Sequence, residues 1–415
     1  MTVEDPVLKL SLEILKERPL CDSCLGRLFA RMGYALENWE RGYAIKTLLH
    51  MRLVSELRRG ADVMEHLKSL ARAHKPTRRF LASIGVHVQE EQCYVCGGLL
   101  AGVEKYAREA AVRLGGIEFD TFVVGTTLPK EVLERESEIV KKYLITAGES
   151  IKHEVNRRIG RELLRLLSGK RVDKLRPNVV VRINIATGEI SIARNPVLVG
   201  GRYLKLSRGI SQAQKLGSVR ATLLEKLSYI RELFGGVEHV VHAAGREDSD
   251  ARMLGAGRPL VVEVKQPARY KAEVAPLVDD DIIFAPEGPV TRDEIRRLKE
   301  RSRVSVKLYR ALVHSERPLA EEELARLSEL SGRVVTQYTP RRIRRRSPRR
   351  KRTRMVYEVA WRRVSGHVFE LYVRCQGGLY VKEFVHGDGG RTTPSVAGVL
   401  GSGLEVVELD VLAVE

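Results

Sequence analysis

Two pairs of cysteines, far apart in the sequence, constrain the fold of this chain more than any other feature. The pairs are Cys21-Asp-Ser-Cys24 and Cys93-Tyr-Val-Cys96, with 68 residues between Cys24 and Cys93. In a cytosolic protein, two such pairs favour a four-thiolate zinc site over disulfides. The residues between them must then fold back so that the four thiols meet. We therefore predict a compact N-terminal module, residues 1–98, with one structural zinc ion bound by Cys21, Cys24, Cys93 and Cys96.

Alternatives to zinc stay open at this stage. The separation of the pairs exceeds that of a simple zinc ribbon, so unliganded thiols or a redox pair also fit the pattern. If zinc binds, four thiolates fill its coordination shell and leave no open position for catalysis. The fifth cysteine, Cys375, lies alone in a strand-like run and is predicted to be an ordinary buried residue.

The charge balance indicates a polyanionic partner. The chain carries 72 Lys and Arg against 53 Asp and Glu, a net charge of +19, and ten of the cations lie within residues 341–354. Such clustering is the electrostatic footprint of a nucleic-acid-binding protein, and arginine suits bidentate contact with phosphate. There is no apolar run long enough for a membrane span, and the acidic Glu4 and Asp5 are unlike a signal peptide. We expect a cytoplasmic protein that makes no contact with membranes.

The periodicity of apolar residues divides the chain into three parts. Helical spacing dominates residues 1–98. Residues 99–204 then predict a strand, a long basic helix and a hairpin that turns at Thr187-Gly188. This order resembles the THUMP domain of RNA-modifying enzymes. Residues 205–415 alternate strands and helices, so we predict a mixed α/β (α+β) protein. We expect this third part to be a catalytic domain built on a largely antiparallel sheet with flanking helices.

Several elements of the third part are predicted individually. Alternating or β-branched apolar runs predict strands, and amphipathic runs that open at capping residues predict helices. The predicted helices are residues 213–233 and 291–300, and the predicted strands are residues 237–241, 260–264, 304–313, 334–338, 356–364, 368–373 and 379–385. The arginine-rich residues 341–354 then form the tip of a hairpin. A further short helix is predicted to begin at Thr393-Pro394, a cap followed by proline.

One segment between two predicted strands is unusually dense in charge and glycine. It reads Gly245-Arg-Glu-Asp-Ser-Asp-Ala-Arg-Met-Leu-Gly-Ala-Gly-Arg-Pro259. Charges near a core are costly unless they are paired or functional. One interpretation is an exposed loop with local ion pairs, and the other is a catalytic carboxylate flanked by phosphate-binding arginines. The glycines allow a tight turn or a close approach of the backbone to a ligand.

Across nearly its whole length the chain resembles the archaeal tRNA pseudouridine synthase 10 family. The cysteine pairs stand where that family has its zinc module, and the charged segment is shared. The other motifs that carry the resemblance are Lys307-Leu-Tyr-Arg-Ala-Leu312, Gln337-Tyr-Thr-Pro-Arg341, and Gly378-Leu-Tyr-Val-Lys-Glu-Phe384 leading into Gly387-Asp-Gly-Gly-Arg-Thr-Thr-Pro-Ser395. The resemblance implies an enzyme that isomerises uridine to pseudouridine at positions 54 and 55 in the TΨC arm of tRNA, with no catalytic cofactor. We expect a monomer.

The resemblance also implies roles for four residues. Asp248 matches the catalytic aspartate of pseudouridine synthases, and Arg246 matches a residue that contacts phosphate or stacks. Tyr309 matches the aromatic residue that stacks on the target base. Lys382 matches the basic residue that pairs with the catalytic aspartate, where a cation favours the charged carboxylate.

Simpler interpretations compete with these roles. Asp250 is a second candidate for the catalytic carboxylate, because residues two apart in a strand share a face. If it is not catalytic, we expect it to pair with Arg252 or Arg258. Lys382 also fits a strand lysine that pairs with its neighbour Glu383 or faces solvent, and Tyr309 also fits an ordinary core residue.

Arginines outside the charged segment are further predicted RNA contacts. They are Arg341, Arg344, Arg345, Arg346 and Arg391. The family typically has His where this chain has Arg344, which keeps the charge. Arg391 follows Gly389-Gly390, a stretch that fits either a phosphate cradle at a helix start or an ordinary glycine turn.

Two other functions also fit features of the sequence. A non-catalytic RNA binder accounts for the charge, and a THUMP-containing methyltransferase or thiolating enzyme accounts for the domain order. The second is disfavoured because the chain lacks a Gly-x-Gly-x-Gly strand turn and a Ser-Gly-Gly pyrophosphate loop.

Overall fold

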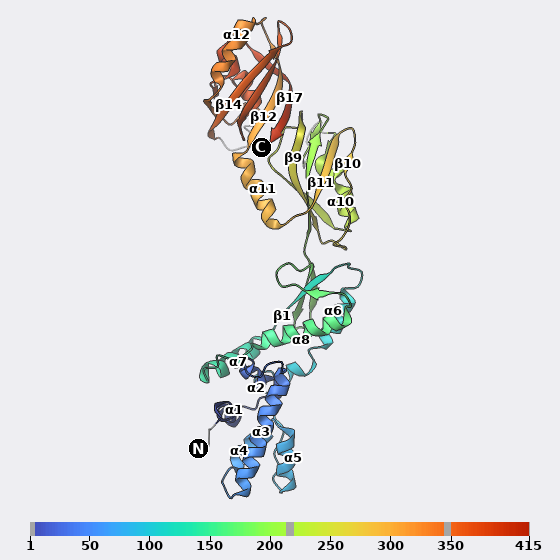
Figure 1. Ribbon diagram of the computed structural model, residues 1–415, viewed down its shortest axis with the longest axis vertical. Coiled ribbons are helices and arrows are strands. Elements are labelled where there is room, and N and C mark those ends of the chain that lie inside the picture. Colours follow the sequence, from blue (N-terminus) through green and yellow to red (C-terminus); the bar gives the residue numbers. More distant parts are fainter. Residues whose placement is uncertain (1–4, 213–219, 344–349, 415) are drawn as a thin grey trace. The chain divides into compact units, whose positions relative to one another are not determined.

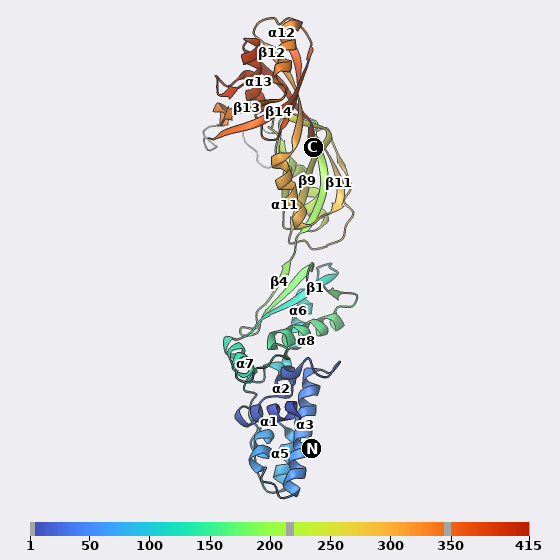
Figure 2. The ribbon, with the colours of Figure 1, turned by 60° about the vertical axis from the view of Figure 1, so that its left-hand side comes forward.

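The structure is a computed structural model that describes residues 5–212, 220–343 and 350–414 (Figure 1). It divides into two compact units, Met1–Asn195 and Pro196–Glu415 (Figures 1 and 2). We call them the N-terminal unit and the C-terminal unit. Within the described ranges, no helix is long and apolar enough to cross a membrane.

The N-terminal unit begins with a group of helices, as predicted. They are α1 (Pro6–Glu17), α2 (Asp22–Gly26), α3 (Asn38–Arg58), α4 (Met64–Ala71) and α5 (Lys75–Ser83). Two glycines allow α2 and α3 to touch. A Cβ on Gly26 would lie 1.8 Å from the carbonyl oxygen of Asn38, and a Cβ on Gly42 would lie 1.9 Å from that of Asp22. The two backbones therefore meet directly, and Cys24 is buried beside them.

The rest of the N-terminal unit is a four-stranded sheet with helices, which confirms the predicted strand, basic helix and hairpin. The strand order is β2-β1-β3-β4, with only the β3–β4 pair antiparallel. The elements are α6 (Lys105–Arg113), β1 (Thr121–Thr127), α7 (Lys130–Lys142), α8 (Ile151–Leu166), β2 (Arg171–Val172), β3 (Val179–Asn184) and β4 (Ile190–Arg194). Val155, Ile159 and Leu163 of α8 are fully buried at a spacing of four residues, so this face packs against the sheet.

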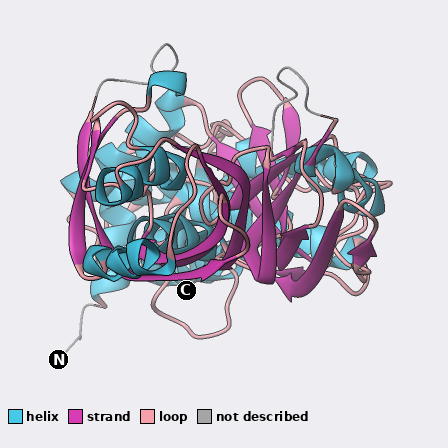
Figure 3. Ribbon diagram, turned by 90° about the horizontal axis from the view of Figure 1, so that it is seen from above, coloured by secondary structure: helices cyan, strands magenta, loops and turns pink. Residues whose placement is uncertain are grey.

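The C-terminal unit is built on one large sheet, shown with its helices in Figure 3. Its order among the described residues is β10-β11-β5-β9-β17-β12-β15-β14-β13-β16, with β8 also paired to β9. The strands are β5 (Val197–Lys205), β8 (Glu238–Ala243), β9 (Ala251–Lys265), β10 (Leu277–Val278), β11 (Ile282–Pro289), β12 (Val306–Ser315), β13 (Arg333–Tyr338), β14 (Lys351–Arg363), β15 (Val368–Gln376), β16 (Thr392–Thr393) and β17 (Leu404–Val414). Among the described strands of this large sheet, β9 and β17 are the only neighbours that run parallel, so the predicted largely antiparallel sheet is confirmed.

Helices flank this sheet, and two apolar cores lie along it. The helices are α9 (Leu223–Lys226), α10 (Ser228–Leu233), α11 (Arg292–Val304), α12 (Glu321–Ala325), α13 (Val381–His386) and α14 (Val396–Leu400). One core contains Tyr203 and Phe284 and the other contains Phe369 and Phe384. Tyr309 packs against both cores. The two cores therefore meet at strand β12.

Three sequence expectations need correction. Residues 379–385 were expected to form a strand, but Val381–His386 is the helix α13, and its buried Val381, Phe384 and Val385 have helical spacing. The helix expected at Thr393-Pro394 begins later, at Val396 with Ser395 as its cap, because Thr392–Thr393 pairs with β13.

The third correction concerns residues 213–233 and the domain boundary. Residues 213–219 lie outside the described residues, and the remainder forms the two short helices α9 and α10 rather than one long helix. A boundary at residue 204 falls inside β5, which pairs with β9 and β11 of the C-terminal unit. The predicted division at residue 98 stays a prediction.

Candidate active site and cysteine cluster

The charged segment begins as a loop and ends as a strand. Residues 244–250 connect β8 to β9, and the rest of the segment is the first part of β9. Gly255 and Gly257 have positive φ, and a Cβ on them would lie 2.0 Å from the carbonyl oxygen of Leu412 and 2.8 Å from that of Tyr203. These glycines therefore permit close contact with the neighbouring strands β17 and β5 rather than with a ligand.

Four of the predicted site residues line a single cavity of about 160 Å³. They are Arg246 and Asp248 from the β8–β9 loop, Tyr309 from β12 and Lys382 from the first turn of α13. Asp248 keeps 44% of its side chain exposed, so it is open to a substrate. The sheet thus brings together residues that are up to 136 positions apart in the sequence, from Arg246 to Lys382.

Two cations face the carboxylate of Asp248. Arg342 Nη1 lies 3.0 Å from Asp248 Oδ2, and Lys382 Nζ lies 4.0 Å from the same oxygen. Lys382 also donates to Asp250 Oδ2 at 2.5 Å. Burial alone would raise the pKa of Asp250, but the hydrogen bond and charge of Lys382 outweigh it and lower that pKa.

The expected partners of Asp250 were wrong. Arg252 instead binds Asp410, at 2.8 Å from both carboxylate oxygens, and Arg258 Nε lies 3.0 Å from Glu247 Oε2. Asp248 and Asp250 also lie in a loop rather than a strand, so the shared-face argument does not apply to them.

Two residues of β12 enter the same cavity. Burial raises the pKa of Tyr309, so its hydroxyl stays protonated and available as a donor at neutral pH. Lys307, two positions earlier, also lines the cavity. Burial and the nearby charge of Arg258 lower the pKa of Lys307 to about 8. Its ammonium is therefore close to titrating under physiological conditions.

A buried polar network lies beneath the β8–β9 loop that carries Asp248. Lys205 Nζ donates to the carbonyl oxygens of Asp248 and Ser249, at 2.9 and 3.2 Å, and lies 3.9 Å from Glu247. Glu247 is bound by Arg258 and accepts a hydrogen bond from the hydroxyl of Tyr203. The network fixes the backbone that carries Asp248, because a buried charge has few alternative partners.

Among the predicted arginines that the structure describes, Arg341 and Arg391 do not line the cavity. Arg391 Nη2 donates to the carbonyl oxygen of Thr339 at 2.8 Å, and its Nε lies 3.4 Å from Asp388. The backbone amide of Arg341 donates to the same carboxylate of Asp388. Strands β13 and β14 form the predicted hairpin. Arg344, Arg345 and Arg346, which the sequence predicts at its tip, lie outside the described residues.

Sequence reasoning missed three cavity residues. Arg342 binds Asp248 and also the buried Glu383 at 2.7 Å, although it was treated only as part of the arginine cluster. Arg352 of β14 lies over the ring of Tyr380 and also lines the cavity. Lys307 was detectable, because alternation along a strand gives it the same face as Tyr309.

The four cysteines of the two pairs come together in the N-terminal unit. Their sulfur atoms all lie within 4.8 Å of one another, and Cys21 and Cys96 are separated by 3.7 Å. Tetrahedral zinc with sulfur at about 2.3 Å brings its ligands to about 3.8 Å from each other. Three of the cysteines are buried, so the donor set and geometry fit one metal ion with a closed shell. Gly97 and Gly98, which follow the second cysteine pair, have positive φ, whereas Gly26, which follows the first pair, allows the contact between α2 and α3.

Comparison with known proteins identifies the family. The family description "Pus10, C-terminal" matches residues 198–415. A curated "tRNA pseudouridine synthase Pus10" from Pyrobaculum arsenaticum is 65% identical over 405 residues, covering 98% of each chain. The chain belongs to the Pus10 family.

A second family description and a second relative agree with Pus10 membership. "Pus10 THUMP domain, archaeal" matches residues 106–184, which include β1, α8 and β3, and confirms the predicted THUMP domain. The "tRNA pseudouridine synthase Pus10" of Thermofilum pendens is 37% identical over 414 residues, covering 95% of this chain and 92% of its own. A solved structure described as "Crystal Structure of a Cbf5-Nop10-Gar1 Complex" aligns with 51% of this chain and 48% of its own at 17% identity, with a TM-score of 0.32.

Proposed function

We propose that this chain isomerises uridines 54 and 55 in the TΨC arm of tRNA to pseudouridine, with Asp248 as the catalytic carboxylate. Its place in the Pus10 family makes it a tRNA pseudouridine synthase, the name carried by its curated relatives. One observation carries the assignment of residues: Asp248, Tyr309 and Lys382 line the same cavity. The expected monomeric state and cytoplasmic location are part of this proposal, and sedimentation of the purified chain tests the first.

The reaction defines what the cavity must supply. The bond from N1 of uracil to C1′ breaks, the base rotates, and C5 bonds to C1′. The proton on C5 is lost and N1 gains one, so the composition of the nucleotide is unchanged and no redox cofactor is called for. A uridine in a folded RNA arm must leave its stack to reach such a site.

Each cavity residue then has a role in this proposal. The carboxylate of Asp248 acts on the ribose and base, and Lys382 and Arg342 stabilise its charge at 4.0 and 3.0 Å. The ring of Tyr309 stacks on the flipped base. Arg246, exposed at the loop, contacts a phosphate of the substrate.

We also propose that Cys21, Cys24, Cys93 and Cys96 hold one structural zinc ion. The four thiolates fit zinc better than a harder ion, which prefers oxygen ligands. Zinc there closes the N-terminal module around its two distant knuckles, at Cys21–Cys24 and Cys93–Cys96. Its effect on catalysis is then indirect, through placement of tRNA.

Substitution of Asp248 by asparagine tests the catalytic assignment. The side chain keeps its shape and loses the charge that the reaction needs, so the rate of pseudouridine formation falls at least about a hundredfold while tRNA binding persists. Asp250→Asn is the matched control, since it removes a carboxylate from the same loop. Mapping of pseudouridine in tRNA, with transcripts carrying cytidine at position 54 or 55, reports both activity and site.

The outcomes separate the competing functions. If Asp248→Asn retains the wild-type rate and Asp250→Asn loses activity, the catalytic carboxylate is Asp250. If the wild type binds tRNA but forms no pseudouridine, the chain is a non-catalytic RNA binder and the proposed function fails.

A further inference from the structure

The N-terminal unit presents an aromatic surface that the proposed catalysis does not use. Tyr34 is fully exposed, and Trp39 and Tyr43 on successive turns of α3 are 55% and 44% exposed. Met32 and Leu36, on the same loop as Tyr34, are about half exposed. We call these five side chains the aromatic platform. Large apolar side chains grouped on a surface mark a binding site more often than an isolated one does.

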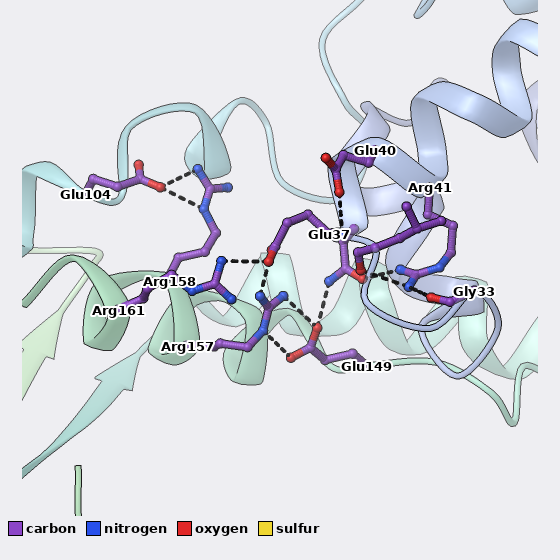
Figure 4. A network of polar contacts seen from close by, with 11 residues as sticks. Gly33, Glu37, Glu40, Arg41, Glu104, Glu149, Arg157, Arg158 and Arg161 are labelled. Atoms are coloured by element: carbon purple, nitrogen blue, oxygen red, sulfur yellow. Dashed lines mark hydrogen bonds and ion pairs between the residues drawn. The ribbon is translucent and has the colours of Figure 1, made fainter. Parts of the chain in front are cut away.

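The loop that carries Tyr34 is held in a defined conformation. The buried guanidinium of Arg41 donates to the carbonyl oxygens of Met32, Gly33 and Leu36 at 2.6, 3.0 and 3.0 Å (Figure 4). Ala35 has φ of +64°, a left-handed conformation that is unfavourable for a residue with a Cβ. A buried charge and a strained residue thus hold Tyr34 in solvent, a combination typical of functional loops.

Cations adjoin the aromatic platform. Glu37, between the loop and α3, accepts hydrogen bonds from Arg157 at 2.8 Å and from Arg161 at 2.6 Å, both on α8 (Figure 4). Arg157, Arg161 and Lys174 line a cavity of about 650 Å³. Glu149 also lines this cavity, and its carboxylate is bound by Arg157. Arg157 and Arg161 therefore link the start of α3 to a cavity whose lining contains more cations than carboxylates.

We propose that the aromatic platform binds unpaired nucleotides of the RNA substrate. Their bases stack on Tyr34, Trp39 and Tyr43, and the arginines of α8 meet the phosphates. Aromatic side chains beside a cationic groove are the combination by which proteins bind single strands. Of the acidic residues in the segment 32–43, Glu37 is bound by Arg157 and Arg161, and Glu40 accepts a hydrogen bond from the backbone of Glu37. A second copy of this basic chain would instead bring further positive charge. The inference rests on the proposed tRNA substrate.

A double variant, Tyr34→Ala with Trp39→Ala, tests the platform. Both side chains are at least half exposed, so folding is unchanged. Loss of two stacking partners weakens tRNA binding at least about tenfold. The salt dependence of Kd stays the same, because no phosphate contact is removed. The matched control is Val112→Ala with Leu144→Ala, which removes two apolar side chains of the same unit that are 80% and 82% exposed.

Tryptophan emission provides a second measurement. The chain has two tryptophans, Trp39 and Trp361. In a Trp361→Phe variant, emission therefore comes from Trp39 alone. A single-stranded RNA oligonucleotide should quench it by stacking, and a blunt duplex of the same sequence should not.

Several results would overturn the inference. A double variant that binds tRNA as tightly as its control leaves the platform without a role in RNA binding, while the proposed catalysis stands. Equal quenching by single strand and duplex rules out stacking of unpaired bases. If the double variant and the wild type sediment differently in the absence of RNA, a second copy of the chain covers the platform in the wild type. If the wild type itself binds no tRNA, the proposed function fails with it, and that result is distinct from the others.

Discussion

Replacement of Lys205 by methionine tests whether buried charge holds the β8–β9 loop, which carries Asp248, in place. Lys205 is 2% exposed and donates from Nζ to the carbonyl oxygens of Ile210, Asp248 and Ser249, at 3.0, 2.9 and 3.2 Å. Methionine has a similar length but neither charge nor donor. The three carbonyls lose their shared donor, and Glu247 loses one of its two cations.

The expected magnitude follows from these contacts. Hydrogen bonds from a charged donor contribute about 1.5–3 kcal/mol each, so three amount to several kcal/mol. The cost of burying the ammonium offsets part of this stabilisation. Burial lowers the pKa of Lys205, although the charges of Glu247, Asp250 and Asp248 act to raise it. Removal of one partner from a buried charged network costs about 3–5 kcal/mol net. For a domain of this size, we expect the melting temperature to fall by at least about 6 °C.

The kinetic effect is expected in kcat rather than in KM. Displacement of Asp248 by about 1 Å should lower the rate about a hundredfold, whereas the phosphate contacts proposed for exposed arginines, which we expect to determine KM, are untouched. The assay combines single-turnover pseudouridine formation with thermal unfolding of the full chain. Lys265→Met is the control, because Lys265 pairs with Glu238 at the surface, where such a pair contributes less than about 1 kcal/mol. If Lys205→Met matches this control in both kcat and melting temperature, the loop does not depend on the buried network.

Three further predictions concern other parts of the chain. The pKa of Lys307 is about 8 in the folded state rather than its usual 10.5, so the unfolded chain binds more protons between these pH values. The free energy of unfolding should therefore rise with pH across that window by up to about 3 kcal/mol. A Lys307→Met variant should lack this rise in denaturant titrations, and an equal rise in both proteins would contradict the prediction. Cys93→Ser should release the metal and unfold the N-terminal module, which metal analysis and circular dichroism report; freshly purified reduced wild type without metal would remove the zinc proposal. Neutralising Arg344, Arg345 and Arg346 together should weaken tRNA binding and flatten the dependence of Kd on salt, because each phosphate contact releases counterions. The melting temperature should not change. An unchanged salt dependence would mean that the cluster only keeps the protein soluble.

Local patterns in the sequence were sufficient for much of the fold. The helix at 291–300, the hairpin around Thr187-Gly188 and the strand carrying Tyr309 follow from capping residues and alternation, and the structure contains them. The strand prediction for residues 379–385 was wrong because the positions of Leu379, Val381 and Val385 suit a strand and a helix alike. Their helical state is set by burial against the second core, which no local window contains.

The candidate site shows the same limit. Motifs nominated Asp248, Tyr309 and Lys382, but their ion-pair partners are set by long-range contacts. Arg342, which follows β13, reaches Asp248 across 94 positions of sequence and also binds Glu383 of α13. Asp250 binds Lys382 for a similar reason, and no spacing rule along the chain predicts such a partner.

The parallel pairing of β9 with β17 has a mechanical consequence. It joins the two halves of the large sheet through only three residue pairs, from Ala251↔Leu409 to Met253↔Val411. Asp248 lies three positions before this joint, on the β8–β9 side, whereas Tyr309 and Lys382 belong to the other half. The cavity therefore lies across this joint, and the gap between the carboxylate and the aromatic ring depends on the angle between the two halves. A small rotation there would change that gap and, because Tyr309 packs against both cores, would also disturb their packing.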